Sequence, residues 1–179
     1  MHHQAKRRLP ALVLLGVLLG LAGCGSIYHE VARREPGSLE QRLDLRQSEA
    51  VELHARTLDA IELIVSDLRE TRRTRTRAGR IERLRTERID AGQLAWRARK
   101  SIASIEDVIV LDREGGIEPG DADGAAQRMT LLERASDEID SALELIEGAV
   151  EAYVNGDPVG VDAIDDHATR ARALVDQSG

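Results

Sequence analysis

Few side chains in this sequence could do chemistry by themselves. Beyond residue 23 the histidines are His29, His54 and His167. A helical di-iron motif would need a glutamate three residues before the histidine, and a zinc site would need further ligands at helical spacing. The positions three residues before two of the histidines hold Val51 and Ile164 instead. The sequence therefore predicts structural histidines with hydrogen-bond partners inside the fold, and no metal site.

Other catalytic and cofactor chemistries also lack their residues. Covalent haem would need C-x-x-C-H, and the chain has a single cysteine. Met129 with a histidine could ligate haem non-covalently, but the pocket would need more large apolar side chains. The serines Ser101, Ser104 and Ser136 have no recognisable nucleophile context. We therefore predict no catalytic residue, no cofactor and no enzymatic activity. A bundle that binds a small ligand, a metal or haem is the alternative interpretation.

The single cysteine, Cys24, ends a segment that is typical of an export signal. Lys6, Arg7 and Arg8 form a basic cluster, and an apolar run of 14 residues follows at positions 9–22, interrupted by one proline and by glycines. A membrane-spanning helix needs about 20 residues, so this run is short for a permanent span. Its length and its basic flank fit the apolar region of a secretory signal peptide.

The end of that run resembles the lipobox of bacterial lipoproteins. Leu21, Ala22, Gly23 and Cys24 match a branched apolar residue, two small residues and a cysteine. The resemblance implies cleavage between Gly23 and Cys24, a diacylglyceryl group on the Cys24 thiol and acylation (palmitate) of the new amino group. Two or three acyl chains hold a protein stably on a bilayer, whereas one does so only marginally. Residues 1–23 are thus expected to be a lipoprotein signal peptide.

The same resemblance implies a location in the cell envelope. Gly25 follows the cysteine where retention in the inner membrane of enteric bacteria would favour aspartate. The implied site is therefore the outer membrane, with the domain facing the periplasm. Residues 24–37, which end in Pro36-Gly37, are expected to be the lipidated cysteine and its tether.

Residues 38–179 are predicted to form one all-α domain. Aromatic residues are nearly absent, so Leu, Ile, Val and Ala must fill the core, which suits slim helices better than sheets. Apolar residues recur at three- and four-residue steps in four segments, and no segment alternates with period two. The prediction is an elongated up-and-down helical bundle of three long helices and one short C-terminal helix.

The apolar stripes give the expected buried faces. The first helix is expected to bury His54, Leu58, Ile61, Val65 and Leu68; the second Ile81, Leu84, Ala91, Ala95, Ala98, Ile102, Ile105 and Ile109. The third is expected to bury Met129, Leu132, Ser136, Ile139, Leu143, Ile146, Val150 and Tyr153; the fourth Val161, Ile164, Ala168, Ala171 and Val175. Residues 69–80 and 112–124 are expected to break the helices, and Asp157 and Pro158 to begin the fourth.

The basic segment at 69–100, with 12 basic and 4 acidic side chains, is the most pronounced charge feature. It could be an anion-binding surface for lipid headgroups, lipopolysaccharide or peptidoglycan. Alternatively, antiparallel packing could bring arginines of the second helix beside carboxylates of the third. That pairing would involve Arg80, Arg83, Arg85 and Arg88 with Glu144, Glu147 and Glu151.

The four arginines Arg72, Arg73, Arg75 and Arg77 are the candidate partner-binding residues. They carry no obvious acidic partner in the sequence. We expect a hairpin at 69–80 that presents them at the end of the bundle far from residue 38; one uninterrupted helix of double length is the alternative.

The expected partners are a membrane, through the lipid on Cys24, and another envelope protein. Nucleic acid is not expected, because no aromatic side chains lie among the arginines to stack on bases. The heptad spacing of the third helix leaves a homo-oligomeric coiled coil open. The sequence thus indicates a lipid-anchored structural or interaction protein.

Overall fold

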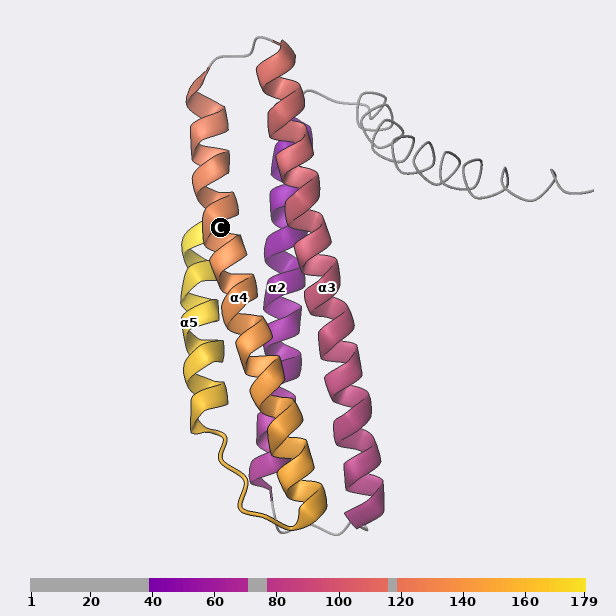
Figure 1. The fold of residues 1–179 in the computed structure, drawn as a ribbon. Coiled ribbons are helices and arrows are strands. Elements are labelled where there is room, and N and C mark those ends of the chain that lie inside the picture. The colour runs from indigo at the N-terminus through magenta and orange to yellow at the C-terminus, as the bar shows by residue number, and fades with distance from the viewer. Residues whose placement is uncertain (1–38, 71–76, 116–118) are drawn as a thin grey trace, which may run out of the picture. The chain divides into compact units, whose positions relative to one another are not determined.

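The periodic apolar segments fold into four α-helices (Figure 1). In this computed structural model the described residues are 39–70, 77–115 and 119–179, and they contain no strand. The helices are α2 (Leu39–Arg69), α3 (Arg77–Gly115), α4 (Pro119–Asn155) and α5 (Asp162–Ser178). The prediction of an all-α bundle with three long helices and one short one is confirmed.

Ion pairs between neighbouring helices give the direction in which each runs. Arg88 of α3 pairs with Glu147 of α4, and Arg99 pairs with Asp137. Because one number rises while the other falls, α3 and α4 are antiparallel. The pairs Arg69–Asp165 and Arg172–Asp59 show the same reversal between α2 and α5.

Helix α2 contacts all three other helices, whereas α3 and α5 do not contact each other. Helices α3 and α5 therefore lie at diagonal positions, and α2 and α4 meet across the middle. Figure 1 shows the chain reversing direction from each helix to the next.

The predicted stripes form the core. Every predicted residue of α2 and α5 is buried, as are those of α3 from Leu84 onward. In α4, Leu132, Ile139 and Ile146 are fully buried, but Met129, Leu143 and Tyr153, which were also expected in the core, are only partly buried. Ile81 of α3 is likewise only partly buried. The prediction of two separate helices packed side by side is confirmed, but α3 already begins at Arg77, inside the break expected at 69–80.

The second predicted break is too wide. The expectation was a breaker over 112–124, yet α3 continues to Gly115 and α4 begins at Pro119. Proline is compatible with the first helical position, because the amide hydrogen that it lacks has no partner there in any helix. Packing then extends the helix across a glycine-rich first turn, and Ala125 is fully buried.

The predicted start of the last helix is wrong. Asp157 does not cap it; the cap position is Val161, with no side-chain hydrogen bond, and α5 begins at Asp162. The amides of Gly156 and Asp157 both donate to the carbonyl of Ala152, which ends α4. Gly156 has φ of 86°, a left-handed conformation that favours glycine. The amide of Asp157 thus serves the end of α4 instead of the start of α5.

Helix α5 is less than half as long as α4, so the bundle has two different halves (Figure 1). Four helices surround the larger core cluster, which includes Leu58, Ile61, Ile139 and Ile164. Three helices surround a smaller cluster, which consists of Ala50, Ile102, Ile105, Ile109, Ala125 and Leu132. The four-helix half includes the end at which α2 finishes and α3 begins.

Candidate functional site

Arg77, one of the four arginines singled out from the sequence, lies at the end of the bundle where α2 finishes and α3 begins. Arg77 is the first residue of α3 and is exposed. Arg72, Arg73 and Arg75 lie outside the described residues, as do Gly23 and Cys24. The structure therefore places one of the four candidate partner-binding arginines.

Arg77 binds the C-terminal end of α4. Its Nη2 donates to the carbonyl oxygens of Tyr153 at 3.2 Å and Val154 at 3.0 Å. The last turn of α4 contains no basic residue of its own. A cation there is favourable, because the final carbonyls of a helix lack intrahelical partners and carry partial negative charge. Arg77 thus supplies from α3 the cation that the last turn of α4 lacks.

Arg80 acts in the same way on α2. Its Nη1 donates to the carbonyl oxygen of Glu70 at 2.6 Å, and Glu70 directly follows the last residue of α2. The first turn of α3 therefore satisfies carbonyl groups at the ends of two neighbouring helices. This gives part of the basic segment a structural role.

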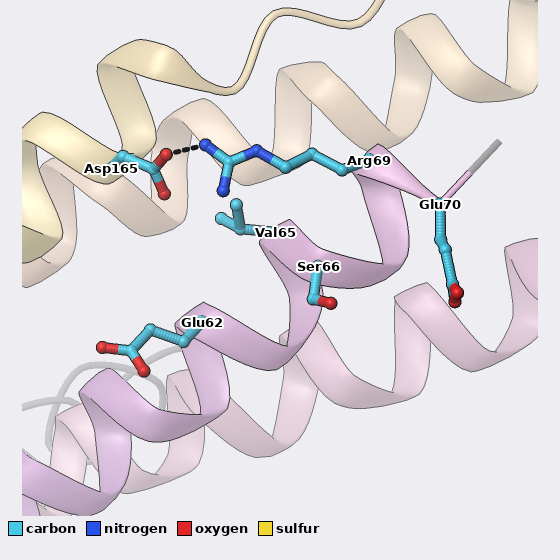
Figure 2. A pocket seen from close by; sticks show the side chains of 6 residues that line it. All are labelled: Glu62, Val65, Ser66, Arg69, Glu70 and Asp165. Carbon is cyan, nitrogen blue, oxygen red and sulfur yellow. Dashed lines mark hydrogen bonds and ion pairs between the residues drawn. The ribbon is translucent and has the colours of Figure 1, made fainter.

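A depression between α2 and α5 lies close to the same end (Figure 2). It is lined by Glu62, Val65, Ser66, Arg69, Glu70 and Asp165. Arg69 reaches across it to pair with Asp165, and Glu62 pairs with Arg172. The one guanidinium that lines this depression is therefore neutralised, so the depression offers no free cation to an anionic ligand.

A groove between α3 and α4 tests the predicted arginine–glutamate pairing. It is lined by Arg85, Arg88, Ile89, Glu147, Val150, Glu151, Val154 and Asn155. The expected contact between Arg88 and Glu147 is present. Arg85 lines this groove together with Glu147 and Glu151, as the antiparallel arrangement predicted.

The same prediction is wrong for Arg83. Its Nε lies 3.1 Å from Asp67 of α2 and 2.6 Å from Glu87 of its own helix. Arg83 and Arg88 are five residues apart, which places them about 140° apart around a helix. The two side chains therefore face different neighbours, and only Arg88 reaches α4.

Arg99 forms a bridge that sequence analysis did not identify. Its guanidinium donates to Asp137 at 3.0 Å and, through Nε, to Asp140 at 3.0 Å. Antiparallel pairs keep a nearly constant sum of residue numbers, so the predicted pair Arg88–Glu147 places Arg99 level with residues 136 and 137. That arithmetic was the available signal.

His54 is a structural histidine, as predicted. It is fully buried; Nδ1 lies 2.7 Å from the carbonyl oxygen of Ala50 and Nε2 lies 2.8 Å from Oγ of Ser136. A neutral ring that donates from Nδ1 and accepts at Nε2 satisfies both contacts. Burial lowers the pKa of His54, and the nearby charge of Arg99 acts in the same direction, whereas the hydrogen bond that the ring donates to the carbonyl of Ala50 opposes the shift.

His167 joins α5 to α4 at the bundle surface. Its Nδ1 lies 2.6 Å from Oε2 of Glu138, and Nε of Arg170 lies 3.0 Å from the same oxygen. Partial desolvation would raise the pKa of Glu138, but the hydrogen bonds and charges of His167 and Arg170 outweigh it and lower that pKa. This cluster is an interhelical polar contact, and sequence analysis did not predict it.

Two other kinds of site are absent from the described part of the chain. No group of three or more His, Cys, Asp or Glu side chains there could hold a metal ion. None of the helices placed by the structure is long and apolar enough to cross a bilayer.

Comparisons of the chain with protein-family models, with curated proteins and with solved structures found no match.

Proposed function

We propose that this chain is a lipid-anchored lipoprotein of the cell envelope, and that its helical domain docks to or scaffolds another envelope component. The observation that carries the proposal is the motif Leu21-Ala22-Gly23-Cys24, preceded by a basic cluster and a short apolar run. Gly25 favours the outer membrane, with the domain in the periplasm. The lipid on Cys24 is the proposed link to the bilayer.

The polar contacts of the helices favour an interaction role over catalysis. The two described histidines are engaged, His54 with Ser136 in the core and His167 with Glu138 at the surface. Arg77 is occupied by the end of α4. A catalytic group would need an accessible reactive atom, and these side chains are bound to neighbouring helices.

The anchor is tested by Cys24→Ser. We expect the wild-type chain to incorporate labelled palmitate and to sediment with membranes, and the variant to lose the label. The variant would then be recovered as soluble or unprocessed protein. A wild-type chain without label, or equal labelling of both chains, would contradict the anchor.

The partner is tested by crosslinking in intact envelopes and recovery of the chain. The comparison uses a triple variant, Arg72→Gln, Arg73→Gln and Arg75→Gln, with Arg77 retained because it binds the end of α4. Reduced recovery of a crosslinked protein would support a binding role if the variant keeps the helicity and the melting temperature of the wild type. Recovery should also fall at high salt, since the screening length shrinks from about 10 Å at 0.1 M to about 3 Å at 1 M. Undiminished recovery would leave these arginines without that role.

A further inference from the structure

Helix α3 carries a line of exposed apolar residues that the bundle does not use. Ile89, Trp96, Ala103 and Val110 follow each other at intervals of seven residues. Ile89 is 54% exposed, Trp96 62% and Val110 40%, and Ala103 is exposed as well. We call these four residues the α3 stripe. Seven-residue spacing keeps them on one side of the helix, as in the seam of a coiled coil.

The α3 stripe is separate from the core face of the same helix. The core face consists of Leu84, Ala91, Ala95, Ala98, Ile102, Ile105 and Ile109, all of which are buried. Outside the stripe, the large exposed apolar side chains of the described helices are isolated. They are Leu45 and Leu63 on α2 and Leu145 on α4. Single exposed apolar residues are ordinary on protein surfaces, whereas a spaced row of four on one helix is typical of an interface.

We propose that two copies of this chain associate through an antiparallel pairing of their α3 stripes. In the symmetric register Trp96 lies opposite Ala103 of the second copy, and Ile89 lies opposite Val110. The largest side chain of the stripe thus meets the smallest, in both halves of a two-fold interface. A parallel pairing would instead set Trp96 against Trp96 and leave a gap at Ala103.

The charge along α3 favours the same direction. The part of α3 at 77–100 carries eight basic and three acidic residues, and the part at 101–115 carries one basic and four acidic residues. The midpoint of the stripe falls between Arg99 and Lys100. Beside the stripe, Arg85 lies on one side of that midpoint and Glu106 and Asp107 lie on the other, with Lys100 next to the midpoint itself. Antiparallel pairing directs Arg85 towards the acidic half of the second copy, with like charges close only at the midpoint, whereas parallel pairing sets every charge along the stripe beside its own equivalent.

The exposed ring of Trp96 is positioned by a neighbouring side chain of the same helix. The ammonium of Lys100 lies 5.1 Å from the centre of the indole ring, a cation–π contact that covers part of one face. The stripe spans three heptads, or about 32 Å of helix. This is short for a coiled coil that must form by itself, so the dimer is reversible and depends on concentration. The inference is independent of the proposed lipid anchor.

The chain contains one tryptophan, which reports on the interface directly. The test is to measure Trp96 emission and sedimentation mass of the full-length chain in mild detergent over a range of concentrations. The expected result is a shift of emission to shorter wavelength that accompanies a doubling of protein mass. Both should occur over the same concentration range, because burial of the indole and association are one event.

Two substitutions to glutamate at exposed apolar positions, one inside the stripe and one outside it, test whether association depends on the stripe. Ala103→Glu places a carboxylate opposite Trp96 of the second copy and should weaken association at least about tenfold, because the buried carboxylate would lack a partner. Leu63→Glu is the matched control, since Leu63 is 60% exposed on α2 and lies outside the stripe. It should leave association unchanged, and both variants should melt like the wild type.

Disulfide crosslinking tests the direction of pairing. In the double variant Ile89→Cys, Val110→Cys the two new thiols lie 21 residues apart, about 32 Å along α3, too far for a bond within one chain. The double variant should form a crosslinked dimer, and Ile89→Cys alone should not, with the unsubstituted chain as the control for Cys24. A wild type that stays monomeric at all concentrations, equal loss of association in both glutamate variants, or crosslinking by Ile89→Cys alone would each overturn the proposal.

Discussion

Arg77 and Arg80 show what an arginine in the first turn of a helix can do for its neighbours. A cation at the start of its own helix is unfavourable, because the N-terminal end of a helix carries partial positive charge. Both side chains instead extend to carbonyl groups at the ends of α4 and α2. The cost at α3 is thereby offset at two other helix ends, and part of the basic segment is structural.

Arg77→Gln should therefore lower the free energy of unfolding by about 1 kcal/mol, since a charge-assisted contact at a helix C-terminus typically contributes that much when exposed. Arg97→Gln is the control, because Arg97 is exposed on the same helix and away from this end. Urea denaturation of the two variants checks the difference. Equal midpoints would mean that the contact of Arg77 with Tyr153 and Val154 contributes nothing.

His54 should make stability depend on pH. Because burial lowers its pKa in the folded state, the unfolded chain binds a proton more readily, with a pKa of about 6.5. The free energy of unfolding should then fall as the pH drops below about 6.5, by about 1.4 kcal/mol for each unit of pKa depression. Glu138 acts at lower pH, since its lowered pKa contributes stability that is lost only when the carboxylate is protonated.

The measurement is urea denaturation of wild type and His54→Gln at several pH values between 7 and 5. The glutamine variant will be less stable at pH 7, but its stability should change less over that interval because no histidine is buried there. An unchanged slope in the variant would assign the pH dependence to other groups.

Among the connections, the end of α4 depends on one backbone conformation. Gly156 has φ of 86°, and a β-carbon there would lie 3.3 Å from Nη2 of Arg77. The same turn gives the amides of Gly156 and Asp157 their acceptor at Ala152. One glycine thus ends the helix and leaves room for the cation that binds it.

Gly156→Ala should cost about 1–2 kcal/mol, the penalty of a left-handed conformation for a residue with a β-carbon. Gly160→Ala is the control in the same connection, because nothing lies within 4 Å of its β-carbon and its φ is not positive. Thermal melts of the two variants, followed by circular dichroism, give the comparison. Equal melting temperatures would show that the turn accepts alanine.

The bundle as a whole is stabilised unevenly, because α5 covers one half of it. The larger core cluster joins all four helices, and the smaller one joins α2, α3 and α4 alone. Fewer buried apolar contacts lower the free energy of local opening. The half of the bundle with three helices should therefore open first.

Hydrogen exchange can detect this difference within one helix. Amides of α3 at 102–109 should exchange faster than those at 84–95, although both ranges lie away from the helix ends and both face the core. Equal protection in the two ranges would indicate a single cooperative unit along the whole bundle. Faster exchange at 84–95 would contradict the expectation outright.

Local periodicity is enough to predict the helices and most of the faces that they bury. The angle between successive side chains is a local property of an α-helix, so the stripes through Leu58, Ile105, Ile139 and Ala171 could be read without knowing any neighbour. The break near 69–80 was also local, because residues without apolar side chains cannot contribute to a core.

Which polar groups meet depends instead on how whole helices pack. Arg99 with Asp137, His167 with Glu138 and Arg77 with the end of α4 join residues 29 to 77 positions apart. Each contact depends on the rotation of a helix about its axis and on its height beside the next one. Those two quantities follow from the packing of whole faces, so no short stretch of sequence contains them.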